Sequence, residues 1–179
     1  TGNLFVSNMF RNPVMARGAS VFVGYNFIAD PGENAIHFYD VPGATPLKAA
    51  VVGNVVTLGS DSDSNITAVQ IPDDMARTNP DAEIFLSDNQ SAPGEVTNRG
   101  GFVLASAAPV VLAPDVSPPA DVRAAVLRYA GSRPGQRGAV DARIVAGVEN
   151  GTGRIIDDPA QVGGLPDTPP VTGGADVPA

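Results

Sequence analysis

The chain has 179 residues, of which 17% are charged, a net charge of −8 at pH 7 and no cysteine. Its length allows one domain with a hydrophobic core, and the lack of cysteine excludes disulfides and thiolate metal sites. The acidic balance argues against a nucleic-acid partner, which would need a basic face. No apolar run approaches the roughly 18 residues of a membrane span.

The basic residues are distributed unevenly along the chain. Residues 1–29 contain Arg11 and Arg17 and no acidic residue, whereas the other nine basic residues and all 19 acidic residues come later. A small cationic patch on an otherwise acidic protein favours the binding of an anionic ligand.

Short apolar runs rich in Val, Ile and Phe dominate the first 110 residues and are separated by clusters of turn-forming residues. This pattern predicts an all-β structure with many corners. The predicted strands cover residues 3–8, 20–29, 35–39, 50–58, 66–71, 83–86 and 101–105.

Four apolar runs are each followed by an asparagine, namely Asn8, Asn26, Asn54 and Asn89, at spacings of 18, 28 and 35 residues. The spacing suits a solenoid in which stacked asparagines satisfy the backbone at a repeated corner while the loops vary in length. It suits equally turn asparagines in a β-sandwich. The residues alone leave both readings open.

The pattern changes after residue 110. Ser117 as N-cap, Pro118 at the first helical position and Gly131 as a stop predict one helix, and a second helix is predicted over residues 139–148. The Pro- and Gly-rich end from Leu165 is expected to be extended or disordered. We therefore divide the chain into a β-rich body, residues 1–115, and a helical and extended tail, residues 116–179, that packs on it.

Two segments resemble the bacterial pectate lyase family of polysaccharide lyases. They are "GNLFVSNMFRNPVMARGASVFVGYNFIADPGENAIHFYD", which contains an Arg-x-Pro motif, and "GAVDARIVAGVENGTGRIIDDPAQVGGLP". The resemblance implies a right-handed parallel β-helix and a secreted protein. A complete member is about twice as long, so the chain corresponds to the C-terminal half. The strand-like opening "NLFVSN" lacks a signal-peptide pattern, from which we expect a mature N-terminus.

The resemblance also implies an activity, the cleavage of polygalacturonate by β-elimination. Arg11, which opens the Arg-x-Pro motif, matches the catalytic base, and Asn12 and Arg17 would bind the uronate. Arg17 follows Arg11 by six residues where the family has five, and in a strand this shift turns the side chain to the other face. Ca²⁺ would neutralise the substrate carboxylate, with ligands mainly in an N-terminal half that would be a separate partner polypeptide.

Several alternatives stand beside this hypothesis. An exposed arginine is most often structural, and the chain could be a non-catalytic β-helix that binds acidic polysaccharide or a partner protein. A calcium-independent pectin lyase is a further alternative, although that family places aromatic residues in its groove and this chain has no Trp. His37, the single histidine, is interpreted as a satisfied strand residue. The segment "DSDSN", residues 61–65, is interpreted as a solvated turn because it lacks the later ligands of a calcium-binding loop.

Overall fold

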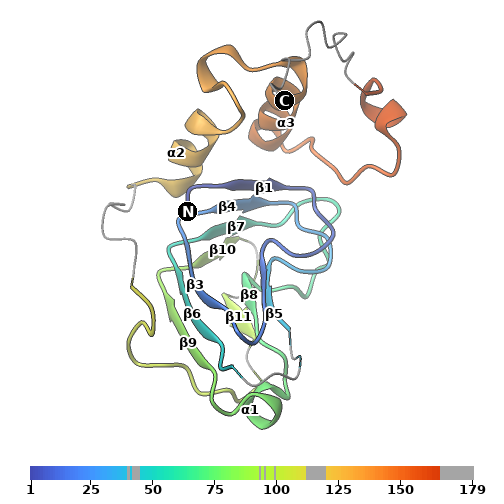
Figure 1. Ribbon diagram of the computed structural model, residues 1–179. Coiled ribbons are helices and arrows are strands. Elements are labelled where there is room, and N and C mark those ends of the chain that lie inside the picture. The colour runs from blue at the N-terminus through green and yellow to red at the C-terminus, as the bar shows by residue number, and fades with distance from the viewer. Residues whose placement is uncertain are drawn as a thin grey trace, which may run out of the picture.

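Parallel β-sheets make up most of the computed structural model (Figure 1), which describes residues 1–39, 41, 45–92, 94, 96–98, 100–111 and 120–165. Helices are few, so the prediction of an all-β class is confirmed at this level. The strands are β1 (Leu4–Val6), β2 (Val14–Met15), β3 (Ser20–Gly24), β4 (Phe27–Ala29), β5 (Ile36–Phe38), β6 (Lys48–Val52), β7 (Val55–Thr57), β8 (Val69–Gln70), β9 (Glu83–Ser87), β10 (Gln90–Ala92) and β11 (Thr97–Asn98).

The chain visits three sheets in turn. The orders are β1-β4-β7-β10, β2-β5-β8-β11 and β3-β6-β9, so that each circuit adds one strand to each sheet. Every pair is parallel and in register, for example Leu4 with Phe27 and Phe27 with Val55. Segments far apart in the sequence are therefore direct neighbours.

A ladder of asparagine side chains links successive circuits at the corner between the third and first sheets. Nδ2 of Asn3 donates to Oδ1 of Asn26 (3.0 Å), Asn26 donates in the same way to Asn54 (2.8 Å), and Asn54 to Asn89 (2.9 Å). Each acceptor oxygen also takes the preceding asparagine's backbone N–H. The predicted stacking is confirmed for Asn26, Asn54 and Asn89. It is wrong for Asn8, because Asn3 is the first member.

Side chains alternate between the space enclosed by the three sheets and their outer faces, as expected for strands. Inside, Ile28, Ile36, Phe38, Val51 and Ile84 belong to one buried cluster to which all three sheets contribute. This cluster is the main hydrophobic core, and it is stabilised by removal of apolar area from water.

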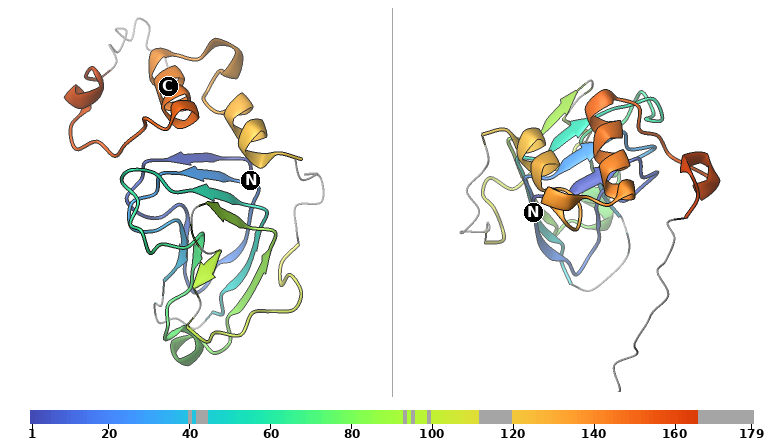
Figure 2. Two further views of the ribbon diagram at one scale, coloured as in Figure 1. Left: turned by 180° about the vertical axis from the view of Figure 1, so that it is seen from behind. Right: turned by 90° about the horizontal axis from the view of Figure 1, so that it is seen from above.

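Two helices cover the outer face of the first sheet (Figure 2). Val126 and Leu127 of α2 (Val122–Tyr129) and Val145 of α3 (Ala139–Asn150) are buried in a second cluster with Phe27 and Ala29 of β4. The remaining helical segments are short: α1 (Met75–Thr78), η1 (Pro134–Gln136) and η2 (Pro159–Val162). Among the described residues, no helix is both long and apolar enough to cross a membrane.

Several predicted boundaries were wrong for identifiable reasons. The runs 20–29 and 50–58 each contain two strands, because Tyr25 and Gly53 adopt left-handed backbone conformations (φ 55° and 64°) that turn the chain. Residues 101–105 form no strand, whereas β2, β10 and β11 were not predicted.

The helix boundaries follow the predictions more closely. The predicted start at Ser117 and Pro118 lies outside the described residues; the described helix begins at Val122 and is capped by Asp121, whose Oδ1 accepts from the N–H of Ala124. The second helix is confirmed, and Gly151 ends it in the left-handed conformation. The extended end predicted from Leu165 lies almost wholly outside the described residues, which stop at Leu165.

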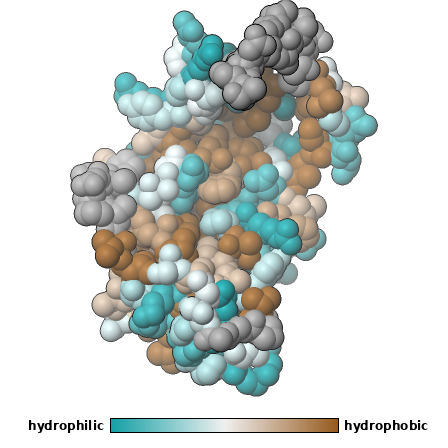
Figure 3. All heavy atoms as spheres, viewed as in Figure 1, coloured by the Kyte–Doolittle hydropathy of each residue, from teal (hydrophilic) through white to brown (hydrophobic). Residues whose placement is uncertain are grey.

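One end of the stacked circuits is open. The outer edges of β1, β2 and β3 pair with no other strand in the part of the chain that the structure describes. Figure 3 views the molecule as Figure 1 does and shows apolar side chains among polar ones on this face. Met9 and Phe10, in the loop of the first circuit, are exposed. Unpaired strand edges of this kind are sites where another strand can add.

The ladder gives a stability prediction. Replacing the fully buried Asn54 by Ala leaves the groups of Asn26, Asn89 and Val23 to which it is hydrogen-bonded without that partner. Unsatisfied buried groups are costly, so we expect the free energy of unfolding to fall by about 2–4 kcal/mol in urea denaturation. The matched control is Asn65→Ala, at an exposed asparagine in a loop. Equal denaturation midpoints for the two variants would show that the ladder does not stabilise the fold.

Candidate functional site

The outer face of the second sheet carries a row of side chains in register. Val14 of β2, His37 of β5 and Gln70 of β8 are direct neighbours across the parallel strands. Ile36 and Phe38 point into the core, so His37 between them points outward. The tail helices lie over the first sheet and not over this one (Figures 1 and 2), and His37 in the middle of the row is itself buried.

Arg11 stands at the corner that leads into β2. Its backbone is left-handed (φ 65°), which turns the chain immediately before the buried Asn12 and the cis Asn12–Pro13 peptide bond. The side chain is exposed, and its Nε donates to the hydroxyl of Tyr39 over 3.2 Å. The guanidinium carbon lies 5.8 Å from the centroid of the Tyr39 ring, within range of a cation–π interaction.

His37 lies beside Tyr39 and Arg11. Its ring centroid is 5.1 Å from that of Tyr39, and its Nδ1 lies 3.4 Å from the carbonyl oxygen of Ala35, to which it can donate. Burial lowers the pKa of the imidazole. The hydrogen bond to Ala35 opposes this effect, and the positive charge of Arg11 adds to the lowering. His37 therefore adds an uncharged ring beside a cation at neutral pH.

Asn12 holds the corner beneath Arg11. Its side chain is buried, Oδ1 accepts from Nδ2 of Asn8 (2.9 Å), and Nδ2 donates to the carbonyl of Asn34 (2.8 Å). The amide thus ties the first circuit to the loop of the second. In this arrangement its visible role is to fix the backbone from which Arg11 projects.

Arg17 lies beyond the other end of β2, and the structure does not bring it together with Arg11. Its guanidinium makes two hydrogen bonds to the carboxylate of Asp81 (2.7 and 3.1 Å) and one to Oδ1 of Asn79 (2.7 Å). The hydrogen bond from Arg17 lowers the pKa of Asp81. A uronate at Arg17 would compete with this carboxylate.

An oxygen-rich pocket of about 450 Å³ adjoins the row. Glu33 and Asp63 supply carboxylates, and Asn34, Asn65 and Gln70 supply amides. Oε1 of Gln70 is buried without a hydrogen-bond partner among the described residues. Ca²⁺ needs six to eight oxygen ligands. The described residues contain no group of three or more acidic, His or Cys side chains placed to hold a metal ion.

Sequence reasoning missed two members of this site, Tyr39 and Gln70. Tyr39 could have been found, because it follows His37 by two residues and so shares its face in an extended chain. Gln70 is adjacent to His37 only through strand pairing between circuits. Nothing in its local sequence marks it.

Comparison of the chain with protein-family models, with curated proteins and with solved structures finds no match. The geometry described above is therefore the basis for any assignment of function.

The environment of His37 gives a pH prediction. The pKa of His37 is lower in the folded chain than the ordinary value of about 6.5 that it has in the unfolded chain. Between these two pKa values the unfolded chain binds more protons than the folded chain. The free energy of unfolding therefore decreases as the pH falls from the ordinary value through the folded pKa. An NMR titration of the single histidine should give a midpoint below the ordinary value. Arg11→Ala should raise this midpoint because it removes a nearby positive charge, and the exposed Arg133→Ala should not. A wild-type midpoint at or above the ordinary value would contradict the burial.

The Arg17–Asp81 pair gives a second prediction. Arg17→Ala should lower the urea midpoint more than Asp81→Ala, because it also removes the hydrogen bond to Asn79. The double variant should be less destabilised than the sum of the two single variants, since both remove one interaction. Strictly additive effects would mean that the pair does not form in solution.

Proposed function

We propose that the chain is the C-terminal portion of a secreted polysaccharide lyase with a right-handed parallel β-helix fold, which cleaves polygalacturonate by β-elimination with Arg11 as the base. The observation that carries the proposal is the placement of Arg11, an exposed arginine held by Tyr39 at the corner that leads into β2. The Arg-x-Pro motif and the C-terminal signature give the family resemblance.

The proposal makes the fold assignment more specific, from stacked parallel sheets to a parallel β-helix. It is supported by the return of the chain to each sheet once per circuit and by the asparagine ladder, which repeats at 23, 28 and 35 residues. A solenoid built from repeated circuits buries a continuous core between neighbours in this way.

The proposed reaction removes the proton on C5 of a uronate, α to its carboxylate. The electron pair of the C5–H bond forms the C4–C5 double bond, and O4 leaves with the electron pair of the C4–O4 bond and is protonated. Nε of Arg11 donates to Tyr39, so a terminal nitrogen of the guanidinium would act as the base. Guanidinium groups are protonated at neutral pH, so such a base requires alkaline conditions.

The exposure of Arg11 supports binding of a uronate unit at the corner that leads into β2. Asn12 fixes the backbone of this corner and Tyr39 holds the guanidinium, whereas His37 beside them is buried. In this proposal Arg17 sits at the far end of β2 and contacts the substrate carboxylate only by competing with Asp81.

The proposal includes a partner, the N-terminal polypeptide half of the same enzyme. The unpaired outer edges of β1, β2 and β3 are suited to a further parallel circuit, which would also cover the apolar side chains at that end. Ca²⁺ would neutralise the carboxylate and stabilise the developing enolate. Its ligands would come mainly from that half.

Arg11→Ala should abolish the formation of unsaturated product. The assay uses the purified native material with any co-purifying polypeptide and follows the ultraviolet absorbance of the 4,5-unsaturated uronide on polygalacturonate, with calcium or with a chelator. Loss of a positioned base costs about 10²–10⁴-fold in rate, whereas the urea midpoint should change little because the side chain is exposed.

Arg133→Ala, at an exposed arginine far along the chain, is the matched control and should keep full activity. Equal activity of Arg11→Ala and wild type would reject Arg11 as the base. Binding of polygalacturonate without any unsaturated product would instead identify a non-catalytic binding protein.

A further inference from the structure

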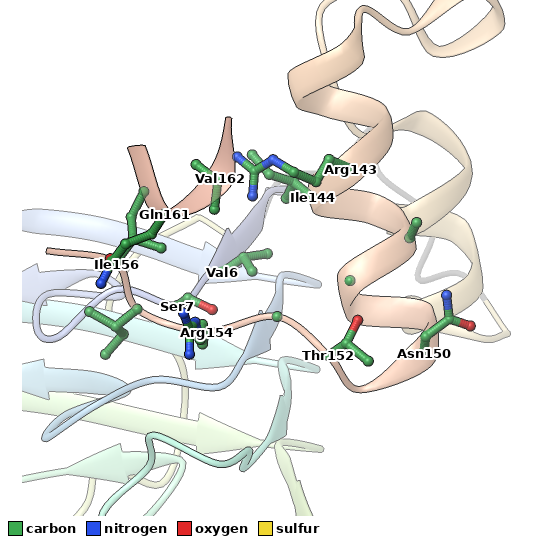
Figure 4. A pocket seen from close by; sticks show the side chains of 14 residues that line it. Val6, Ser7, Arg143, Ile144, Asn150, Thr152, Arg154, Ile156, Gln161 and Val162 are labelled. Atoms are coloured by element: carbon green, nitrogen blue, oxygen red, sulfur yellow. The ribbon is translucent and has the colours of Figure 1, made fainter. Parts of the chain in front are cut away.

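Residues 143–162 of the C-terminal signature segment line a pocket that the proposed function does not use. After α3 the chain reverses at Gly151 and runs back through residues 152–162 beside the first circuit. Between these parts lies a pocket of about 580 Å³ (Figure 4). Val6 and Ser7, at the end of β1, also line it. This volume lies within the range of about 300–1,000 Å³ that is usual for small-molecule sites.

Two arginines give this pocket a positive charge. Arg143 projects from α3 toward Val162, and Arg154 lies beside Ser7 (Figure 4). Neither arginine forms an ion pair or a side-chain hydrogen bond with another described residue. None of the described lining residues is acidic. The carboxylate of Asp61 lies just behind the lining residue Ile155, so the positive charge belongs to the described lining and not to its wider surroundings. Such a lining attracts anions.

The wall that carries Arg154 is anchored to the body. The carboxylate Oδ2 of Asp61 accepts a hydrogen bond from the N–H of Ile155. At the far end, Asp158 and Gln161 form a capping box that fixes the start of η2. The backbone of the wall is therefore held at two points, on either side of which the ligand would find a fixed surface.

The rest of the lining is mixed in character. Asn150 and Thr152 offer amide and hydroxyl groups, and Ile144 and Ile156 offer apolar surface. The buried hydroxyl oxygen of Ser7 has no hydrogen-bond partner among the described residues. Buried polar groups are normally paired, and a ligand atom at the floor would supply such a partner.

We propose that this Arg143–Arg154 pocket binds a small carboxylate ligand that also carries hydroxyl groups. The two guanidinium groups hold the carboxylate through charge-assisted hydrogen bonds. Asn150 and Thr152 bind the hydroxyl groups, and the isoleucines cover the carbon skeleton. A uronate unit and a free hydroxycarboxylic acid share this chemistry. The pocket lies apart from Arg11, so the proposal does not depend on the proposed lyase activity.

The test is an NMR titration of the ¹⁵N-labelled chain, followed at the amides of Gly147 and Gly153, which line the pocket. The probes are trigalacturonate, citrate and a neutral galactose trisaccharide. We expect saturable shifts with at least one of the two anions, weaker binding at higher salt, and no saturable shift with the neutral sugar. Shifts with trigalacturonate alone identify a uronate site, and shifts with citrate alone identify a site for free acids.

Arg143→Ala and Arg154→Ala should each weaken binding at least about tenfold, since each removes a charge-assisted hydrogen bond. Arg133→Ala, outside the pocket, should bind as wild type does. If Arg154→Ala loses the dispersed spectrum of a folded protein, Arg154→Gln serves in its place.

The proposal is overturned if neither anion shifts Gly147 and Gly153, if the neutral trisaccharide shifts them equally, or if Arg133→Ala weakens binding as much as the pocket variants. Arg11→Ala separates the two proposals, because it should abolish lyase activity and leave these shifts unchanged.

Discussion

The asparagine ladder is the constraint on which the rest of this structure depends. In the ladder, the side-chain N–H of each asparagine donates to the asparagine of the next circuit. The side-chain oxygen that accepts it also accepts the backbone N–H of the donating asparagine. Asn54 is fully buried, and a shift of one residue in register would leave its polar groups unpaired in the core. The ladder therefore fixes register at one corner, and strand pairing carries that register to all three sheets.

Because the ladder fixes the register at one corner, the loops at the other two corners can differ in length between circuits. The turn at the ladder is always short, with two residues between β3 and β4, β6 and β7, or β9 and β10. The growth of the repeat from 23 to 35 residues is therefore absorbed by the loops on either side of the second sheet. Arg11, Tyr39 and the oxygen-rich pocket all lie in these loops or at their borders. The fold thus separates a constant scaffold corner from the corners that carry chemistry.

The sequence allowed the class of fold and three of the four ladder asparagines to be predicted. Asn8 follows an apolar run and also a left-handed residue, Ser7, but no strand begins directly after it. Ladder asparagines follow a left-handed residue and directly precede a strand, as in Gly2–Asn3 and Tyr25–Asn26. This backbone signal is hidden, since Tyr25 is not a residue that favours a positive φ. Strands of two residues, such as β2 and β8, are too short to show any period. They exist because their neighbours in the adjacent circuits hold them.

The arginines show most clearly what sequence alone cannot decide. The positive charge of residues 1–29 reads as one patch, yet folding divides it: the carboxylate of Asp81 pairs with Arg17, while Arg11 meets the hydroxyl and ring of Tyr39. Asp81 is 64 residues from Arg17, so no local sequence pattern predicts that the two side chains pair. Arg143 and Arg154 come from residues 120–165, which carry six arginines and five acidic residues, and they share a pocket without a described acidic lining residue. The carboxylates that the fold brings beside an arginine decide whether it is structural or available to a ligand. This cannot be read from the number of charges in a stretch of sequence.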